Sequence, residues 1–446
     1  MIFRSLVAVA IAFAPSMSMS AEPKGAVSKE RLARVDGKVD ALLPDLEKIY
    51  VDFHRNPELS LQEVRTSARL AKELEDLGFE VTTKVGQTGV VGLLKNGDGP
   101  LLLVRTDMDA LPVVEATNLP YASKVVARDR KGQEVGVMHA CGHDIHMTSW
   151  VGTARVMASM KDKWAGTLMF IAQPAEEIGT GARLMLADGL YKRFGKPDYC
   201  LALHADNRMP HGHVSFTEGL AMANVDTVEI LVKGRGGHGS APHTTIDPIV
   251  LAAKIVIDLQ TIVSRERDPV DPAVVTVGSI HGGTKSNIIP NEVRLQLTVR
   301  TTKDSTRKSV LEAIARLTKA AAMGARAPEP VITIVPDEFT PALYNDVKLT
   351  RRITGLFGQI IGEDKLHERP VLMGGEDFSR YALQGEIPIF MYWLGSVSDD
   401  RYTDSLKETG KPLPSMHSDS YYPLPAPTIR TGVRTMSMAI LELVGR

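Results

Sequence analysis

The chain has 446 residues, more than one hydrophobic core of roughly 100–200 residues usually organises, so two domains are expected. Its 52 Lys and Arg residues nearly balance its 53 Asp and Glu residues, and no long basic run interrupts this balance. A nucleic-acid-binding surface needs concentrated positive charge, which this composition excludes. The composition therefore favours a small-molecule partner over nucleic acid.

The first residues differ from the rest of the chain. Residues 1–4 carry one positive charge, residues 6–14 are an unbroken apolar run, and small residues follow up to Ala21. This three-part pattern is typical of a secretory signal, so we expect residues 1–21 to be a signal peptide cleaved near Ser20 or Ala21. The alternative is an uncleaved membrane anchor, but the apolar run is well short of the ~20 residues that a span requires. The sequence thus predicts export, to the periplasm or out of the cell, without stable membrane insertion.

Apolar runs alternate with helical patterns along most of the remaining chain. Helices are predicted at 27–50, 66–77, 147–160 and 182–190, with Gly78 in the position just past the second helix. Strands are predicted at 80–85, 90–94, 101–105, 166–172, 199–204 and 389–394. Strands that alternate with helices indicate an α/β domain with a mostly parallel sheet covered by helices. We assign residues 22–223 and 339–446 to this domain.

The segment 224–338 has a different order of elements. Strands at 226–233, 273–280, 292–300 and 331–335 and helices at 246–266 and 305–323 follow the β-α-β-β-α-β, ferredoxin-like plan. The first helix is expected to bury one face, formed by Ile249, Ala252, Ala253, Val256, Leu259 and Val263. The strand 292–300 alternates apolar and polar residues, so only one of its faces can be covered by the helices. An α+β domain inserted into the α/β domain is predicted.

Side chains that can bind metal or transfer protons gather where the α/β strands end. Ligands bind at the carboxyl ends of such strands, so these side chains are expected at one edge of the sheet. The mixture of thiol, imidazole and carboxylate suits zinc or manganese better than calcium. The residues concerned are Asp107, Asp109, Glu176, Glu177, His204, the loop residue His417, and Cys141 and His143 just before a helix.

Two local questions stay open from the residues alone. Cys141 and Cys200 are the two cysteines of a chain expected to be exported, so a disulfide between them is an alternative to a metal-binding thiolate at Cys141. The flanking histidines favour the metal ligand. In the pair Glu176–Glu177, one carboxylate can bind metal while the other acts as a general base, but spacing does not say which.

Five motifs in order carry a family resemblance: RTDMDALP at 105–112, MHACGHD at 138–144, QPAEE at 173–177, GGHG at 236–239 and GGEDF at 374–378. Together they resemble the amidohydrolase branch of the aminoacylase and carboxypeptidase metallopeptidase family, which includes hippurate hydrolases, N-acyl-amino-acid hydrolases and auxin-conjugate hydrolases. The resemblance covers nearly all of the chain after the predicted signal.

The resemblance implies a role for each matching residue. Two divalent ions, zinc or manganese, would be bound by Cys141, His143, Glu177, His204 and His417, with Glu176 as the general base. The insert would be a lid or dimerisation domain, so a homodimer through this domain is one expectation. The wider family has His-x-Asp where this chain has Asp107-Met108-Asp109, which leaves Asp107 and Asp109 as groups that orient the ligands. Substrate would be held by His238, Asn287, Arg300, Gly374 and Gly375, with His238 supplied by the same chain or by a partner subunit.

The expected activity is hydrolysis of an N-acyl or N-aroyl amino acid, or of a similar small conjugate. One alternative is a dipeptidase or carboxypeptidase acting on short peptides. A second alternative, of another class, is a binding protein that has kept the fold without the chemistry. It predicts missing ligands, and every ligand position of the motifs is filled in this sequence.

Overall fold

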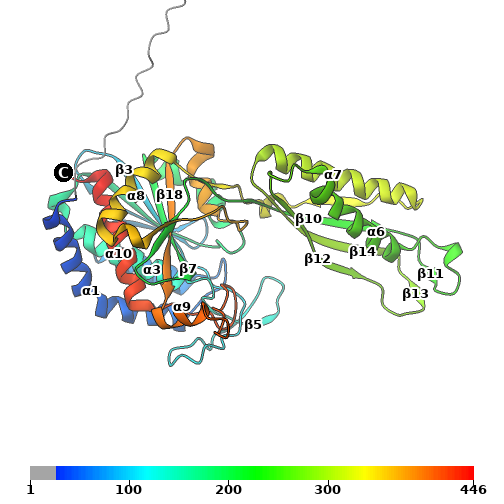
Figure 1. Ribbon diagram of the computed structural model, residues 1–446, viewed down its shortest axis with the longest axis horizontal. Helices are drawn as coiled ribbons and strands as arrows, with labels where there is room; N and C mark the ends of the chain where they lie inside the picture. The colour runs from blue at the N-terminus through cyan, green and yellow to red at the C-terminus, as the bar shows by residue number, and fades with distance from the viewer. Residues whose placement is uncertain (1–26) are drawn as a thin grey trace, which may run out of the picture.

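The computed structural model describes residues 27–446, so the predicted signal peptide lies outside the described residues. The chain forms a large α/β body and an elongated arm that extends from it (Figure 1). Within residues 27–446, no helix combines the length and the apolar character that crossing a membrane would need.

The body is built on an eight-stranded sheet with the order β1-β2-β6-β3-β7-β18-β8-β17. Its central strands β6, β3, β7 and β18 are parallel to one another, while β1 and β2 extend the sheet in antiparallel fashion. The mostly parallel sheet predicted from the sequence is confirmed. The strands are β1 (Glu80–Val85), β2 (Gly89–Asn96), β3 (Leu101–Asp107), β6 (Gly166–Gln173), β7 (Tyr199–Pro210), β8 (Val214–Phe216), β17 (Leu366–Glu368) and β18 (Ile389–Val397).

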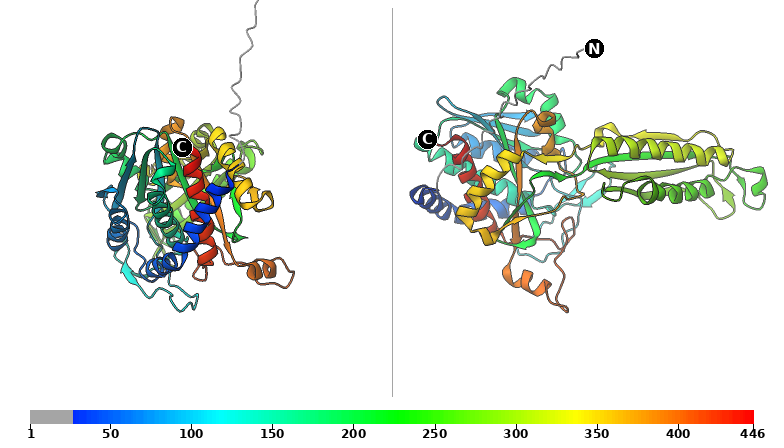
Figure 2. Two further views of the ribbon diagram at one scale, coloured as in Figure 1. Left: turned by 90° about the vertical axis from the view of Figure 1, so that its left-hand side faces the viewer. Right: turned by 45° about the horizontal axis from the view of Figure 1, so that its top comes forward.

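Helices cover both faces of this sheet (Figure 2). One face carries α1 (Lys29–Arg55), α2 (Val64–Glu75), α3 (His143–Ala158), α8 (Val347–Ile361) and α10 (Pro425–Val444), whose apolar side chains share one core with the sheet. The other face is covered by α4 (Gly181–Ala187), α5 (Leu190–Phe194) and the 3₁₀ segment η6 (Asp377–Gly385). After α2, Gly78 adopts φ +81° and Phe79 N donates to Leu74 O, which is the predicted glycine stop.

The arm is a four-stranded antiparallel sheet with the order β12-β14-β10-β15, covered on one side by α6 and α7. This order is that of the ferredoxin-like plan, and the predicted α+β insert is confirmed; its predicted boundaries at 224 and 338 stay a prediction. Along β14, Val293, Leu295, Leu297 and Val299 are buried while the alternate residues face outward, as predicted. The elements are β10 (Asn224–Lys233), α6 (Pro248–Thr261), β12 (Ala273–Gly282), β14 (Glu292–Thr301), α7 (Asp304–Gly324) and β15 (Val331–Ile334).

The predicted buried face of α6 is wrong in part. Ile249 and Val263 are 42% and 40% exposed and Ala253 is exposed, whereas the buried face contains Leu251 and Ile255. The helix is apolar nearly all round, so hydrophobic spacing alone allows two overlapping faces. The two faces share Ala252 and Leu259, and the sheet selects the one that adds Leu251 and Ile255.

Replacement of Leu295 by Ala tests the arm as a separate core. The side chain is fully buried, so Leu295→Ala is expected to destabilise the arm by about 2–5 kcal/mol. The three tryptophans, Trp150, Trp164 and Trp393, all lie in the body. Urea unfolding should therefore show an earlier circular-dichroism transition with no matching change in tryptophan fluorescence.

The matched control is Arg294→Ala, one residue away on the exposed face, which should change stability by no more than about 0.5 kcal/mol. A fluorescence transition that shifts together with the circular-dichroism transition in Leu295→Ala would show that the arm and the body unfold as one unit.

Candidate metal centre

The centre begins at the junction between a loop and α3. Gly142 precedes the helix with φ +83°, and a Cβ there would lie 2.9 Å from Tyr421 Oη, so glycine is required by both backbone and space. The turn lets the side chains of Cys141 and His143, both buried, converge. The helix was predicted to start at residue 147 but starts at His143, because the left-handed Gly142 forms its N-cap.

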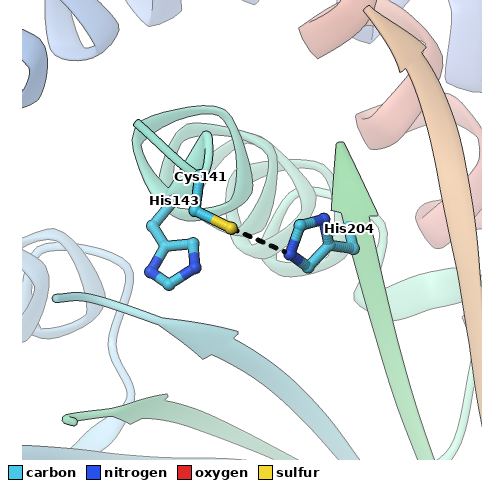
Figure 3. A group of neighbouring side chains, drawn as sticks. All are labelled: Cys141, His143 and His204. Carbon is cyan, nitrogen blue, oxygen red and sulfur yellow. Dashed lines mark hydrogen bonds between the residues drawn. The ribbon is translucent and has the colours of Figure 1, made fainter. Parts of the chain in front are cut away.

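Cys141 Sγ lies between two imidazoles. His204, near the middle of β7, places Nε2 3.5 Å from the sulfur. Figure 3 shows the contact between these two side chains. His417 comes from the loop before α10 and places its Nε2 3.2 Å from the same sulfur. The His417 backbone has φ +66°, and its N–H donates to Ala140 O, which ties the two ligand-bearing segments together.

Glu176 and Glu177, just past the end of β6, complete the cluster. Glu177 Oε1 lies 3.7 Å from His143 Nε2, and Glu177 Oε2 lies 3.5 Å from His417 Nε2. Glu176 Oε2 is 3.9 Å from His143 Nε2. The structure thus brings all five predicted ligands and the predicted base into overlapping groups whose ligand atoms lie within 4.8 Å of one another. Their assignment as ligands and base stays a prediction.

Two buried atoms at this centre suit a cation. Among the described residues, His143 Nε2 and Glu177 Oε1 are buried without a hydrogen-bond partner. Burial raises the pKa of Glu177 to about 7. Burial lowers the pKa of His143, but Asp107 and the other carboxylates around it outweigh this effect and raise it to about 10. The site is therefore strongly negative, and a divalent cation would satisfy both orphan atoms while it displaces a proton from the imidazole.

The ring orientations also fit metal binding. His143 Nδ1 donates to Asp109 O at 2.8 Å, and His204 Nδ1 donates to Ala205 O at 2.7 Å. Each bond fixes one nitrogen as the donor and leaves Nε2 directed into the cluster, which is how metal-binding histidines are usually held. Cys141 and Cys200 are both free, so the disulfide alternative is wrong.

Asp107 and Asp109 contact the groups around the ligands. Asp107 accepts from His146 Nδ1 and from Arg105 Nη1, each at 2.7 Å. Asp109 accepts the backbone N–H groups of Glu176 and Glu177 at 3.0 and 3.1 Å. Asp107 Oδ2 also lies 3.7 Å from His143 Nε2, and the orienting role of both aspartates stays a prediction.

Sequence reasoning missed Glu63, which holds the turn before the two glutamates. Ala175 has φ +51°, a left-handed conformation that is unfavourable for alanine. Its N–H donates to Glu63 Oε1 at 2.9 Å, while Thr88 Oγ1 donates to the other carboxylate oxygen at 2.6 Å. No periodicity marks Glu63, because its role depends on a contact with a distant part of the chain.

A second missed group surrounds the Arg105 side chain, which is buried. The guanidinium donates to Asp107 and, at 2.9 Å, to Glu376 Oε1, and Asp377 lies 3.4 Å away. Glu176 lies in one group with Glu376 and Asp377. Burial and the neighbouring Glu376 raise the pKa of Glu176 well above its usual value. This network could have been predicted from the charged residues within the motifs at 105–112 and 374–378.

The predicted substrate-binding residues fall into two places. Arg300 is half-buried and donates from Nη1 to Met373 O at 3.4 Å, which places it beside the Gly374–Gly375 turn at the base of the arm. His238 and Asn287 meet at the far tip, near β11 (Gly237–His238) and β13 (Ile288–Ile289), where Gly239 N donates to Asn287 O (Figure 1). The single chain therefore does not bring His238 and Asn287 to the metal centre.

Comparisons with known proteins agree with this architecture. Residues 103–408 match Peptidase family M20/M25/M40. The chain is 37% identical over 353 residues to N-acetylcysteine deacetylase of Bacillus subtilis, covering 79% of this chain and 88% of that protein. It is 37% identical over 372 residues to hippurate hydrolase of Campylobacter jejuni, covering 80% of this chain and 92% of that protein.

A solved structure, the YXEP protein of Bacillus subtilis, aligns with a TM-score of 0.70 and 31% identity over 91% of this chain and 99% of that one. It is described as a dinuclear metal-binding peptidase of the M20 family. The family match spans most of the body and the whole arm, including most of the candidate ligands. The chain belongs to Peptidase family M20/M25/M40 and is a metal-dependent amide hydrolase.

Proposed function

We propose that the chain hydrolyses the amide bond of N-acyl or N-aroyl amino acids, or of similar small conjugates with a free carboxylate. The observation that carries this proposal is the buried thiol, imidazole and carboxylate cluster with Glu176 beside it. The names of the two curated relatives, a deacetylase of an acyl amino acid and a hippurate hydrolase, support the substrate class. A dipeptidase or carboxypeptidase is the second candidate, because a short peptide also presents an amide and a carboxylate.

Glu176 is the group best placed to move a proton. When bound, divalent ions supply Lewis-acid activation of water and of the substrate carbonyl. The Glu176 carboxylate, with its raised pKa, can accept a proton from the attacking water and return it to the leaving amine. Asp109 accepts the backbone N–H of Glu176 and Glu63 accepts that of Ala175, and these bonds fix the backbone from which the Glu176 side chain extends.

We propose two divalent ions, zinc or manganese. Two overlapping ligand groups support the number: Cys141 with His143 and His204, and Cys141 with Glu177 and His417. A thiolate favours zinc, while imidazole and carboxylate also accept manganese. Elemental analysis of the purified protein tests the identity of the metal.

We also propose a homodimer through the arm, with the tip residue His238 supplied to the partner's centre. Two observations support it. His238 and Asn287 lie at the opposite end of the arm from their own metal centre (Figure 1). In addition, α6 exposes Val250 and Ile257 at 67% and 69%, an apolar surface that a second copy would cover.

Export is proposed on the N-terminal pattern alone. The charged, apolar and small-residue segments of residues 1–21 support a cleaved secretory signal. N-terminal sequencing of the mature protein should begin near residue 21 or 22, and an intact Met1 would contradict the proposal.

Replacement of Glu176 by Gln should abolish turnover while the metals remain bound. The amide has nearly the same shape but cannot accept the proton, so kcat should fall by about 100-fold or more. Metal content by mass spectrometry should equal that of the wild type, and chelation of the wild type should remove activity that zinc or manganese restores. Retained turnover in Glu176→Gln would refute the assignment, and a protein inert on acyl amino acids and dipeptides after metal loading would favour a binding role.

Replacement of Arg300 should affect only substrates with a free carboxylate. A charge-assisted hydrogen bond contributes about 1.5–3 kcal/mol, so Arg300→Ala should lower kcat/KM for acyl amino acids by about 10–100-fold. The same substrates with the carboxylate converted to an amide should change little. Arg294→Ala, on the same face of β14 but nearer the tip, is the matched control. An equal loss on both substrate types would show that Arg300 does not bind the carboxylate.

Complementation tests whether His238 acts between subunits. His238→Ala and Glu176→Gln should each be inactive, but co-expressed chains can form a mixed dimer with one intact centre. Random pairing should restore about a quarter of wild-type activity, because half of the dimers are mixed and half of their centres are complete. Activity that stays at the level of the single variants in purified mixed dimers would place His238 in its own subunit's centre or outside catalysis.

A further inference from the structure

His54, in the last turn of α1, is a buried histidine with both ring nitrogens hydrogen-bonded. Nδ1 lies 2.7 Å from Asp144 Oδ2, and Nε2 lies 3.1 Å from Glu115 Oε1. Both carboxylate side chains are fully buried. The ring packs edge-on against Tyr121 and also contacts Tyr50, so it is enclosed on several sides.

The contacts of His54 define its charge. Ionised carboxylates only accept hydrogen bonds, so each ring nitrogen must donate, and the ring is an imidazolium. Burial acts against this charge, but the hydrogen bonds to Asp144 and Glu115 outweigh it and raise the pKa of His54 to about 9. Within residues 27–446, no other cation forms an ion pair with Asp144 or Glu115.

Asp144 connects His54 to the turn that carries two predicted ligands, Cys141 and His143. Asp144 is the second residue of α3 and directly follows His143. Its Oδ1 accepts the N–H of Ile145, and its backbone oxygen accepts from Thr148 Oγ1, so the carboxylate is part of the first helical turn. A shift of Asp144 would therefore move the turn that carries Cys141 and His143.

Glu115 connects His54 to the loop that carries His417. Glu115 accepts the N–H of Ser123 at 2.5 Å, which closes the loop that follows Asp109. The next residue, Ala116, donates its N–H to Asp419 O at 2.8 Å, two residues after His417. The same loop exchanges two backbone hydrogen bonds with the ligand segment, between Leu111 and Met138.

We propose that His54 is a positioning residue of the metal centre: its imidazolium holds the Cys141–His143 turn and the His417 loop in one arrangement through Asp144 and Glu115. The inference depends on the proposed metal centre but not on the substrate. His54 touches none of the ligands, so it acts on metal affinity through the position of the two segments and through the charge balance of two buried carboxylates.

Zinc titration of the metal-free full-length protein tests this role. His54→Gln carries no charge and has both its N–H donors on one nitrogen, with an acceptor oxygen at the other end, so zinc affinity, measured by competition with a chromophoric chelator, should weaken by about 10–100-fold. Hydrogen exchange should accelerate at residues 111–123 and 415–421. Tyr121→Phe, which contacts the ring but changes no charge, should keep wild-type affinity.

Glu115→Gln tests the contact of His54 with Glu115 separately from its contact with Asp144. It also replaces His54→Gln as the test variant if His54→Gln does not fold. It keeps the contact between His54 and Asp144, so it should weaken zinc binding less and accelerate exchange mainly at 415–421. Wild-type zinc affinity in both variants, or a lower melting temperature with unchanged affinity, would overturn the inference. Failure of the wild-type protein itself to bind zinc or manganese would instead refute the proposed metal centre.

Discussion

The burial of many carboxylates at one edge of the central sheet is the constraint on which the rest of the body depends. Ionised groups are costly away from water unless opposite charge or hydrogen bonds compensate them. Arg105 compensates Asp107 and Glu376, and His54 compensates Asp144 and Glu115. No cation forms a direct hydrogen bond with Glu176 or Glu177 among the described residues, Glu176 also lies beside Glu376 and Asp377, and burial is the main reason that the pKa of each is raised. Bound divalent cations would complete this balance, so the fold itself favours metal.

The sequence predicted which side chains gather at the strand ends. It gave a wrong prediction, or none, for features that tertiary contacts determine. The clustering of the candidate ligands could be predicted because parallel strands bring their carboxyl ends to one edge. The buried face of α6 could not, since its apolar residues surround the helix and only the sheet determines which ones are covered. His54 and Glu63 were missed for a related reason. The residues that they contact at the metal centre, Asp144 and Ala175, lie 90 and 112 residues later in the chain, and nothing local marks them.

The predicted substrate-binding residues lie at two different distances from the metal centre, some at the base of the arm and others at its tip. Arg300 lies at the base beside the turn of Gly374 and Gly375, where a Cβ on Gly375 would meet Val225 at 2.5 Å. This close packing leaves no room for a side chain at residue 375, so the turn lies directly against β10 at the base of the arm. His238 lies at the tip instead. A two-fold dimer would reconcile the two positions without a large deformation of the chain, because isologous contact brings each tip toward the other subunit.

The two cysteines show how environment determines the role of one chemical group. Burial raises the pKa of Cys200 far above its usual value, and its sulfur lies 4.0 Å from the Tyr191 hydroxyl, so it remains a protonated residue of the core. Cys141 is also buried, and the negative charges of Glu177 and Glu176 further oppose its ionisation. A thiolate there requires a cation directly at the sulfur. The imidazoles of His204 and His417 on either side are themselves metal ligands by type, so the arrangement around Cys141 is suited to a bound metal and poorly suited to a free reactive thiol.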